Sequence, residues 1–151
     1  MTGKFSAINS VTPQLVATVT LTVETGGAGF NDITAEATRF IERIGAGEGA
    51  LLLYLRHTSA SLVIQENADP DVRADLDRFF ARLVPDGDPL FEHTCEGPDD
   101  MPAHVRTALT TVNLSIPFHD GRLALGTWQG VYLWEHRRQG GARKLVVHLG
   151  E

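Results

Sequence analysis

The chain has 151 residues, of which 42% are hydrophobic and 21% are charged, and this composition is typical of a single globular domain with a hydrophobic core. The formal net charge of −6 excludes a general nucleic-acid-binding protein, because such a protein needs a basic face to displace counterions. The single cysteine, Cys95, excludes an internal disulfide. The first ten residues carry no apolar signal segment, and no apolar run reaches the ~20 residues that a membrane helix needs. We therefore expect a cytoplasmic protein with no membrane contact.

The N-terminal third predicts a strand followed by a helix. Residues 14–24 alternate between apolar side chains and threonines, which indicates a half-buried strand. The stretch GGAGFND, residues 26–32, lies where a dinucleotide-binding loop would lie, but Asp32 occupies the position of that loop's third glycine. We therefore favour the alternative, in which Asn31 or Asp32 caps a helix that ends near Ile44.

The middle of the chain predicts two strands and two helices. Residues 50–55 and 61–64 are apolar runs with the length of buried strands. Asp69 and Pro70 supply a capping oxygen and a preformed first turn for a helix that ends near Leu83. Its apolar side chains are expected to face the core; they are Val72, Leu76, Phe79, Phe80 and Leu83. A shorter helix is expected from Pro102 to Leu109.

The C-terminal third predicts strands at residues 111–118, 122–125, 130–136 and 143–149. Asp120-Gly121 and Gly140-Gly141 are the signals for hairpin turns between them. Three helices with seven or eight short strands favour an α+β fold built as a mostly antiparallel or mixed β-sandwich. We expect one domain over residues 1–151.

Polar side chains that suit binding and catalysis gather where the predicted strands end and in one long loop, where functional residues usually lie. The candidates for catalysis are His57, Glu66 and Asp100. Asp99 and Asp100 precede Pro102, so one of them is expected to cap the following helix, which leaves the other to hold an ion or to orient a histidine.

Two sets of residues could bind a divalent metal ion. Neutral imidazoles of His93, His104 and His136 suit Zn²⁺. A carboxylate set suits Mg²⁺ and consists of Glu66, Asp69, Asp99 and Asp100. The sequence does not choose between the two metals, and we favour the histidine set because its members are harder to explain otherwise. His119 is expected to be exposed in a turn, and His148 to have a structural role.

The stretch GTWQG, residues 126–130, is a glycine-flanked turn whose main-chain N–H groups could surround an anion. Gly126, Thr127 and Gln129, together with Ser59, are therefore the candidates for phosphate binding. The alternative is a bulged hairpin in which Trp128 packs against the protein. Glu135 alternates with His136 along the predicted strand, so we expect it to serve a neighbouring subunit.

Three blocks of the sequence closely resemble the YjbQ-like family, the "secondary thiamine-phosphate synthase" proteins: TSASLVIQENADPDV, HTCEGPDDMPAH and GRLALGTWQGVYLWEHR. The resemblance covers nearly the whole chain. It implies a compact α+β sandwich-like fold and a homotrimer. It also implies a site at the subunit boundary, assembled from the histidines and the turn 126–129, that holds a metal or an anion.

The activity that the resemblance implies is a weak thiamine-phosphate synthase, which joins a hydroxymethylpyrimidine pyrophosphate to a thiazole phosphate and releases pyrophosphate. Expelling pyrophosphate requires that its charge be neutralised, usually by a divalent ion. We therefore expect a metal- and phosphate-binding enzyme with a phosphorylated small-molecule substrate and a divalent ion, Zn or Mg. The alternative is a non-catalytic homotrimer that binds a metal or a small metabolite.

Overall fold

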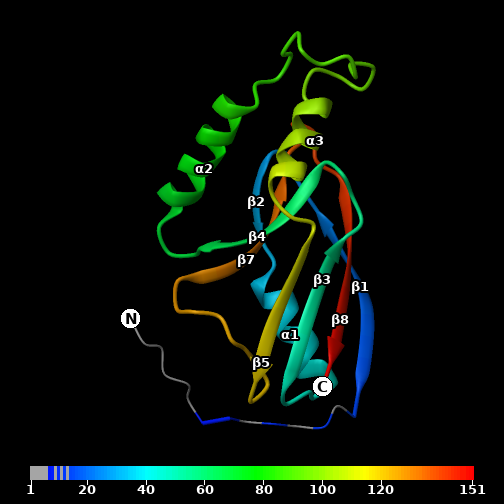
Figure 1. Ribbon diagram of the computed structural model, residues 1–151, viewed down its shortest axis with the longest axis vertical. Coiled ribbons are helices and arrows are strands. Elements are labelled where there is room, and N and C mark those ends of the chain that lie inside the picture. Colours follow the sequence, from blue (N-terminus) through cyan, green and yellow to red (C-terminus); the bar gives the residue numbers. More distant parts are fainter. Residues whose placement is uncertain (1–6, 9, 11, 13) are drawn as a thin grey trace.

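The computed structural model describes residues 7, 8, 10, 12 and 14–151, so the expectation about the first ten residues falls largely outside the part described. The described elements follow the chain in this order (Figure 1): β1 (Val16–Glu24), β2 (Gly29–Asp32), α1 (Thr34–Ile44), β3 (Gly49–Leu55), β4 (Ala60–Glu66), α2 (Pro70–Leu83), α3 (Asp100–Leu109), β5 (Asn113–His119), β6 (Arg122–Leu123), β7 (Gln129–Glu135) and β8 (Ala142–Gly150). Three helices and eight strands confirm the predicted α+β class.

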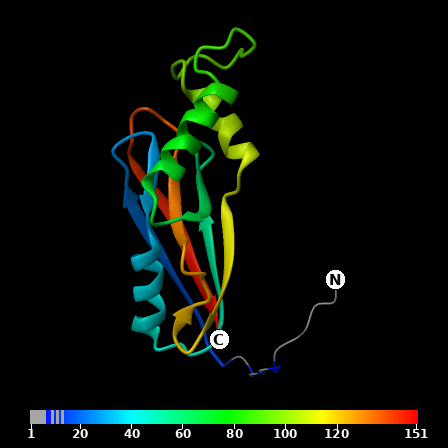
Figure 2. The same cartoon turned by 90° about the vertical axis from the view of Figure 1, so that its left-hand side faces the viewer.

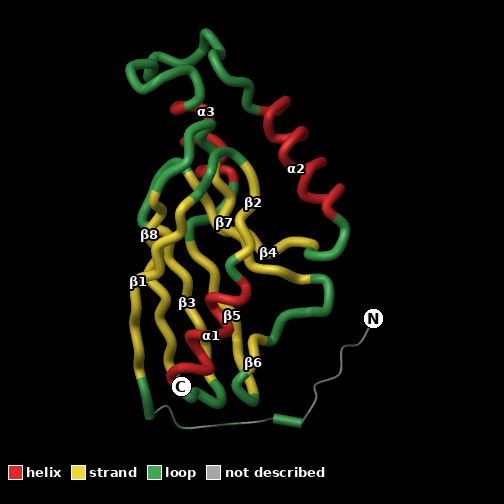
Figure 3. The backbone as a smooth tube through the Cα atoms, turned by 180° about the vertical axis from the view of Figure 1, so that it is seen from behind, coloured by secondary structure: helices red, strands yellow, loops and turns green. Residues whose placement is uncertain are grey.

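The strands form two sheets, and every pairing within them is antiparallel among the described residues. One sheet has the order β1-β8-β3-β5-β6 and the other has the order β2-β7-β4. Helix α1 lies along the sheet strands on one side of the molecule (Figure 3). The long loop between α2 and α3 projects beyond the ends of the strands (Figure 2).

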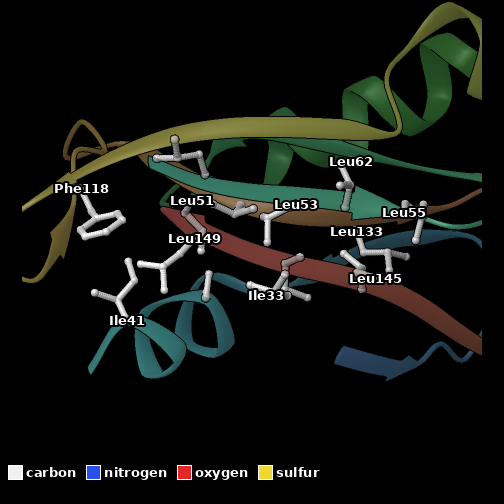
Figure 4. Close-up of a cluster of buried hydrophobic side chains, with 14 of the residues drawn as sticks. Ile33, Ile41, Leu51, Leu53, Leu55, Leu62, Phe118, Leu133, Leu145 and Leu149 are labelled. Carbon is white, nitrogen blue, oxygen red and sulfur yellow. The ribbon is translucent and has the colours of Figure 1, made fainter. Parts of the chain in front are cut away.

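The hydrophobic core lies between the two sheets and α1 (Figure 4). Alternate residues of β3 point inward, because successive side chains of a strand face opposite sides. The largest fully buried apolar side chains come from all three layers: Ile33, Ile41, Leu51, Leu53, Leu55, Leu62, Phe118, Val131, Leu133, Leu145 and Leu149.

Strand β7 is buried on both faces from Gly130 to Glu135. It lies between β2 and β4, and its register with β4 pairs Glu135 with Ala60 at one end and Gln129 with Glu66 at the other. These ends are six residue steps apart along the strand, which corresponds to roughly 20 Å at about 3.3 Å per residue. This register decides which of the predicted site residues are neighbours.

The start of the first helix differs from the prediction. Residues 29–32 form β2, which pairs with β7, and the helix begins only at Thr34. The side chain of Asp32 still accepts a hydrogen bond from the Thr34 N–H at 2.9 Å, but Ile33 occupies the N-cap position. Pairing with β7 overrides the local signal for a helix start, because the strand supplies partners to the main-chain polar groups.

Helix α2 has the predicted bounds but not the predicted burial. Asp69 caps it by accepting a hydrogen bond from the Asp71 N–H at 2.9 Å, and Pro70 opens it. The prediction that its apolar face enters the core is wrong: none of its residues is buried, and Phe79 and Leu83 are 49% and 55% exposed. In Figure 1 the helix lies to one side of the strands, and it contacts β7 through Trp134, which donates to Asp77 at 2.8 Å.

Of the two predicted hairpins, the structure contains one. Asp120 and Gly121, with φ of 51° and 70°, connect β5 to β6, as a type I′ turn requires. The Gly140-Gly141 hairpin is wrong, because β7 and β8 belong to different sheets. The bulged hairpin around Trp128 is wrong for the same reason, since β6 and β7 also lie in different sheets, and this side chain is 63% exposed.

Among the described residues, no helix is long and apolar enough to span a membrane.

Candidate functional site

Two histidines and one aspartate converge where the long loop meets α3. Nε2 of His93 lies 2.7 Å from Oδ2 of Asp100, and Nε2 of His104 lies 3.3 Å from the same oxygen. One ligand atom from each of the three residues lies within 4.8 Å of the others, so the group could hold a metal ion. We call His93, Asp100 and His104 the triad group.

The local sequence explains how the triad group forms. Helix α3 begins at Asp100 rather than at Pro102, so Asp100 and His104 lie four residues apart and therefore on one face of the helix. His93 approaches from the preceding loop. The expected capping aspartate is not found: Asp99 occupies the N-cap position but makes no side-chain capping hydrogen bond.

Both aspartates instead bind Arg137, the second residue after the end of β7. Nε of Arg137 donates to Oδ2 of Asp99 at 3.1 Å, and Nη1 donates to Oδ1 of Asp100 at 2.6 Å. Nη2 donates to the carbonyl oxygen of Glu96 at 2.9 Å. One guanidinium thus ties the loop and the start of α3 to the sheet.

The aspartate of the triad group is ionised despite its burial. Asp100 is only 2% exposed, and burial alone would raise the pKa of its carboxyl group. The hydrogen bond with His93 and the charge of Arg137 outweigh burial and lower this pKa. An ionised carboxylate facing two imidazole nitrogens is a ligand set suited to a divalent cation.

The orientation of His104 is defined by the main chain. Its Nδ1 lies 2.9 Å from the carbonyl oxygen of Thr58, and only a protonated Nδ1 can donate there. With Nδ1 turned to the Thr58 carbonyl, Nε2 is the ring nitrogen that faces Asp100. The side chains of His93 and His104 are 44% and 31% exposed, so a ligand from solvent can reach the open side of the triad group.

A buried ion pair between Arg143 and Glu135 lies next to Ser59, the residue that follows Thr58. Arg143 donates to both oxygens of Glu135, through Nε at 2.8 Å and Nη2 at 2.5 Å. The same Nη2 donates to Oγ of Ser59 at 3.0 Å. Hydrogen bonds from Arg143 and Thr25 outweigh burial and lower the pKa of Glu135. Because Glu135 is 1% exposed and bonded within its own chain, the expectation that it serves a neighbouring subunit is wrong.

His57 lies at the edge of this ion pair. Its Nε2 accepts a hydrogen bond from the Lys144 N–H at 2.9 Å, and its Nδ1 lies 3.4 Å from Nη1 of Arg143. Burial, reinforced by the charge of Arg143, lowers the pKa of the imidazole. His57 therefore remains neutral at neutral pH.

His136 lies outside the triad group. The ring is 2% exposed, and its Nε2 lies 2.9 Å from Oγ of Ser61. Burial, followed by the charge of Arg106, lowers the pKa of His136 to about 4. The structure therefore gathers two of the three histidines favoured by the sequence and adds Asp100 as their partner.

The remaining predicted residues lie at the other end of β4 and β7. Glu66 accepts hydrogen bonds from the N–H groups of Ala68 and Asp69, both at 2.7 Å, and so ties the turn before α2. The Gly126 N–H donates to Oε1 of Gln129 at 2.8 Å. Within one chain the register thus separates these residues from the triad group.

The main-chain carbonyl groups around Thr127 are likewise hydrogen-bonded within the chain. Nδ2 of Asn67 donates to the carbonyl oxygens of Thr127 and Gln129 at 3.2 and 3.3 Å. Asn67 thereby links the end of β4 to the turn 126–129. The four carboxylates proposed for Mg²⁺ do not come together: Glu66 and Asp69 organise the start of α2, whereas Asp99 and Asp100 bind Arg137.

Two hollows adjoin the triad group. The first has a volume of about 320 Å³ and is lined by His93 and residues of the long loop. The second has a volume of about 600 Å³ and is lined by His57 and His104, among others. Each hollow thus includes one imidazole of the triad group in its wall.

Sequence reasoning placed His93 and His104 in one candidate metal set with His136, and it left one aspartate to hold an ion or orient a histidine. It did not assign Asp100 to the same group as those two histidines. The signal was available in the four-residue spacing of Asp100 and His104, once the helix is taken to begin at the aspartate. It also missed Arg137 as the residue that orients Asp100. No local signal points to that contact, because the two residues are 37 positions apart.

The fold and this cluster define a small α+β protein with a group of two partly exposed histidines and one buried aspartate. Residues 19–151 match the model of the family described as UPF0047 protein YjbQ-like, and the chain belongs to this family. It is 48% identical over 129 residues to UPF0047 protein sll1880 of Synechocystis, covering 85% of this chain and 88% of that protein. It is 47% identical over 131 residues to UPF0047 protein YjbQ of Salmonella typhimurium, covering 86% and 94%.

Solved structures have the same fold. A YjbQ/UPF0047-family protein from Clostridium acetobutylicum superposes with a TM-score of 0.80 at 30% identity, covering 87% of this chain and 98% of that one. A conserved hypothetical protein from Thermus thermophilus gives 0.79 at 36% identity, with coverages of 87% and 98%. The predicted YjbQ-like fold is therefore confirmed.

Proposed function

We propose that this protein is a metal-dependent enzyme acting on a phosphorylated small molecule, with the divalent ion held by His93, Asp100 and His104. The observation that carries the proposal is the convergence of two imidazole Nε2 atoms on one oxygen of a buried, ionised carboxylate. Three protein ligands with an open side are the usual composition of a catalytic zinc site.

The donor set favours Zn²⁺ over Mg²⁺. Two nitrogens and one oxygen suit zinc, whereas Mg²⁺ prefers oxygen ligands. The Thr58 carbonyl that receives the Nδ1–H of His104 is the kind of outer partner that metal-binding histidines have in proteins. The contact of Arg137 with Asp100 does the same for the carboxylate.

The reaction that the family resemblance implies, thiamine-phosphate synthesis, fits the surroundings of this group. Its chemistry requires that the negative charge on departing pyrophosphate be neutralised, which a bound divalent ion supplies. The two hollows offer separate places for two substrates, one beside His93 and one beside His104. His57 lies in the wall of the second hollow as a neutral ring whose Nε2 already accepts the Lys144 N–H.

We also propose that the protein acts as a homotrimer. Helix α2 exposes Phe79 and Leu83, and the sheet exposes Leu52 and Tyr54 by 38% and 47%; apolar surface of this kind is a candidate for contact between subunits. The turn 126–129 lies at the far end of β7 from the triad group of its own chain. A second copy could bring that turn, with its glycines and Gln129, to the triad group as the phosphate-binding element.

Metal content is the first test of this proposal. Purified protein is expected to retain about one Zn²⁺ per chain after dialysis, as measured by elemental analysis. His93→Ala and His104→Ala are expected to lose it, and His119→Ala is the matched control because this histidine lies in the β5–β6 hairpin. Zinc retained by both variants would contradict the ligand assignment.

Turnover is the second test. Zinc-loaded protein is assayed for pyrophosphate release from the hydroxymethylpyrimidine and thiazole substrates. Release that disappears in His104→Ala supports the enzyme. Zinc-dependent binding of phosphorylated compounds without turnover supports the alternative of a non-catalytic binding protein.

A further inference from the structure

The hollow beside His93 has walls unlike those of the rest of the site. It has a volume of about 320 Å³ and lies between the long loop and the first turn of α3. Its lining includes an aromatic ring, a thioether and three proline rings. These residues are Phe91, Met101, Pro89, Pro98 and Pro102.

The loop that forms this hollow is held in shape before any ligand arrives. The Gly87 N–H donates to the carbonyl oxygen of Pro98 at 3.0 Å, which closes the loop across its base. The side chain of Asp88 accepts a hydrogen bond from the Leu90 N–H at 2.9 Å. Arg137 holds the other end through Glu96 and Asp99. A preformed pocket avoids the entropic cost of ordering a loop on binding.

The hollow adjoins the triad group through His93, which lines the hollow and belongs to the group. A molecule that fills the hollow therefore contacts Phe91, Met101 and His93, and His93 is one of the proposed metal ligands. Aromatic and thioether side chains favour flat apolar rings. Small-ligand pockets start at about 300 Å³, so this volume suits a single ring with a short substituent.

We infer that this hollow is a subsite for a flat, apolar ring of a substrate whose anionic group reaches the triad group. The inference rests on the proposed function, since the metal centre supplies the partner of the anionic group. It adds a substrate class: phosphate monoesters of ring-bearing alcohols should be preferred over those of small aliphatic alcohols.

The test compares two phosphate monoesters that differ only in the apolar part. Zinc-loaded protein is titrated by calorimetry with methyl phosphate and with benzyl phosphate. Burial of the ring is expected to make benzyl phosphate bind about 10-fold tighter or more. Phe91→Ala and Met101→Ala are expected to reduce this advantage. Leu90→Ala is the matched control, because Leu90 belongs to the same loop but is 79% exposed and does not line the hollow.

The possible outcomes separate the subsite from the metal centre. Equal affinities of the two esters in the zinc-loaded protein overturn the ring subsite and leave the metal centre intact. A benzyl advantage that falls as much in Leu90→Ala as in Met101→Ala also overturns it. Zinc binding without any binding of either phosphate overturns the phosphate part of the proposed function. The comparison of esters uses the unaltered protein, so it stands even where Phe91→Ala does not fold.

Discussion

Arg137 and Asp100 form a 2.6 Å hydrogen bond between Nη1 and Oδ1, while the other oxygen of the same carboxylate faces His93 and His104. The two oxygens of one buried side chain are thus divided between a structural arginine and the triad group. Because the arginine holds Oδ1, Oδ2 is directed at the two imidazoles. The affinity of the proposed site for a metal ion therefore depends on Arg137, which is not one of the proposed ligands.

Replacing Arg137 by alanine is expected to lower zinc affinity about 10- to 100-fold, the usual effect of losing an outer partner of a metal ligand. Arg137→Lys should recover part of the loss, because it restores the charge but not the three-way contact. Zinc affinity is measured by competition with a chromophoric chelator. Arg138→Ala is the control, since its side chain binds Asp86 rather than Asp100. An unchanged affinity in Arg137→Ala would contradict this role.

The buried pair of Glu135 and Arg143 is expected to be costly to break. Their side chains are 0% and 12% exposed, so Arg143→Met leaves an unpaired buried carboxylate and should lower the free energy of unfolding by about 3–5 kcal/mol. Urea denaturation measures the loss. Arg39→Met removes an exposed pair with Glu36 and should cost less than about 1 kcal/mol.

The double variant Glu135→Gln with Arg143→Met completes this experiment. Removing both charges avoids the unpaired carboxylate, so the double variant should be more stable than Arg143→Met alone. A double variant that is less stable than the single one would argue against charge burial as the cause.

Stability should fall as the pH drops from about 6.5 to about 4. The folded pKa of His136 is about 4, below its ordinary value of 6.5, so the unfolded chain takes up this proton first as the pH falls. The stability is fully present above pH 6.5 and is lost on acidification through this window, by about 3 kcal/mol for a 2.5-unit difference. Urea denaturation at pH 7, 5.5 and 4.5 measures it.

The matched comparison for this pH effect is between two histidines. His136→Gln should have a shallower loss of stability with falling pH than the unaltered protein, because no buried imidazole remains at that position. His119→Gln should keep the original slope, since the side chain of His119 is 59% exposed. Identical slopes in the protein and in His136→Gln would show that another group carries the effect.

The proposed trimer should depend on the exposed face of α2. Leu83→Glu and Phe79→Glu place charges on side chains that are 55% and 49% exposed in one chain, so they should leave the chain folded and release monomers. Light scattering after gel filtration measures the mass, and circular dichroism checks the fold. Arg78→Ala on the same helix is the control, because Arg78 pairs with Asp75 at the surface. A monomeric mass for the unaltered protein would contradict the trimer.

Local signals predicted the bounds of α2 but not its surroundings. The bounds of α2 follow from Asp69 and Pro70, whose capping effects act within one turn. Its burial depends on where the helix lies relative to the sheets: Phe80 packs against Trp134 of β7 with ring centroids 4.8 Å apart, whereas Phe79 and Leu83 remain exposed. At residues 29–32 the predicted secondary structure itself was wrong. The local residues indicated a helix start, but this segment pairs with β7 as a strand.

In the candidate site, too, some contacts follow from local spacing and others depend on the tertiary structure. Asp100 and His104 are close because four helical residues separate them, and that spacing is visible in the sequence. His93 and His104 were chosen for their chemistry, but nothing local predicted that His136 would pair with Ser61 instead. The family resemblance placed the turn 126–129 with the histidines at a subunit boundary, and the register of β4 with β7 puts this turn at the opposite end of the strand within one chain.

The sequence by itself determined the α+β class, the extent of α2, the type I′ turn at Asp120-Gly121 and the family, because each depends on neighbours along the chain or on an ordered series of motifs. Only the tertiary structure decided that Arg137 would join Asp99 and Asp100 and that Arg143 would join Glu135 to Ser59. Those contacts depend on which strands enter which sheet. That choice is set by burial of the whole core rather than by any short stretch of residues.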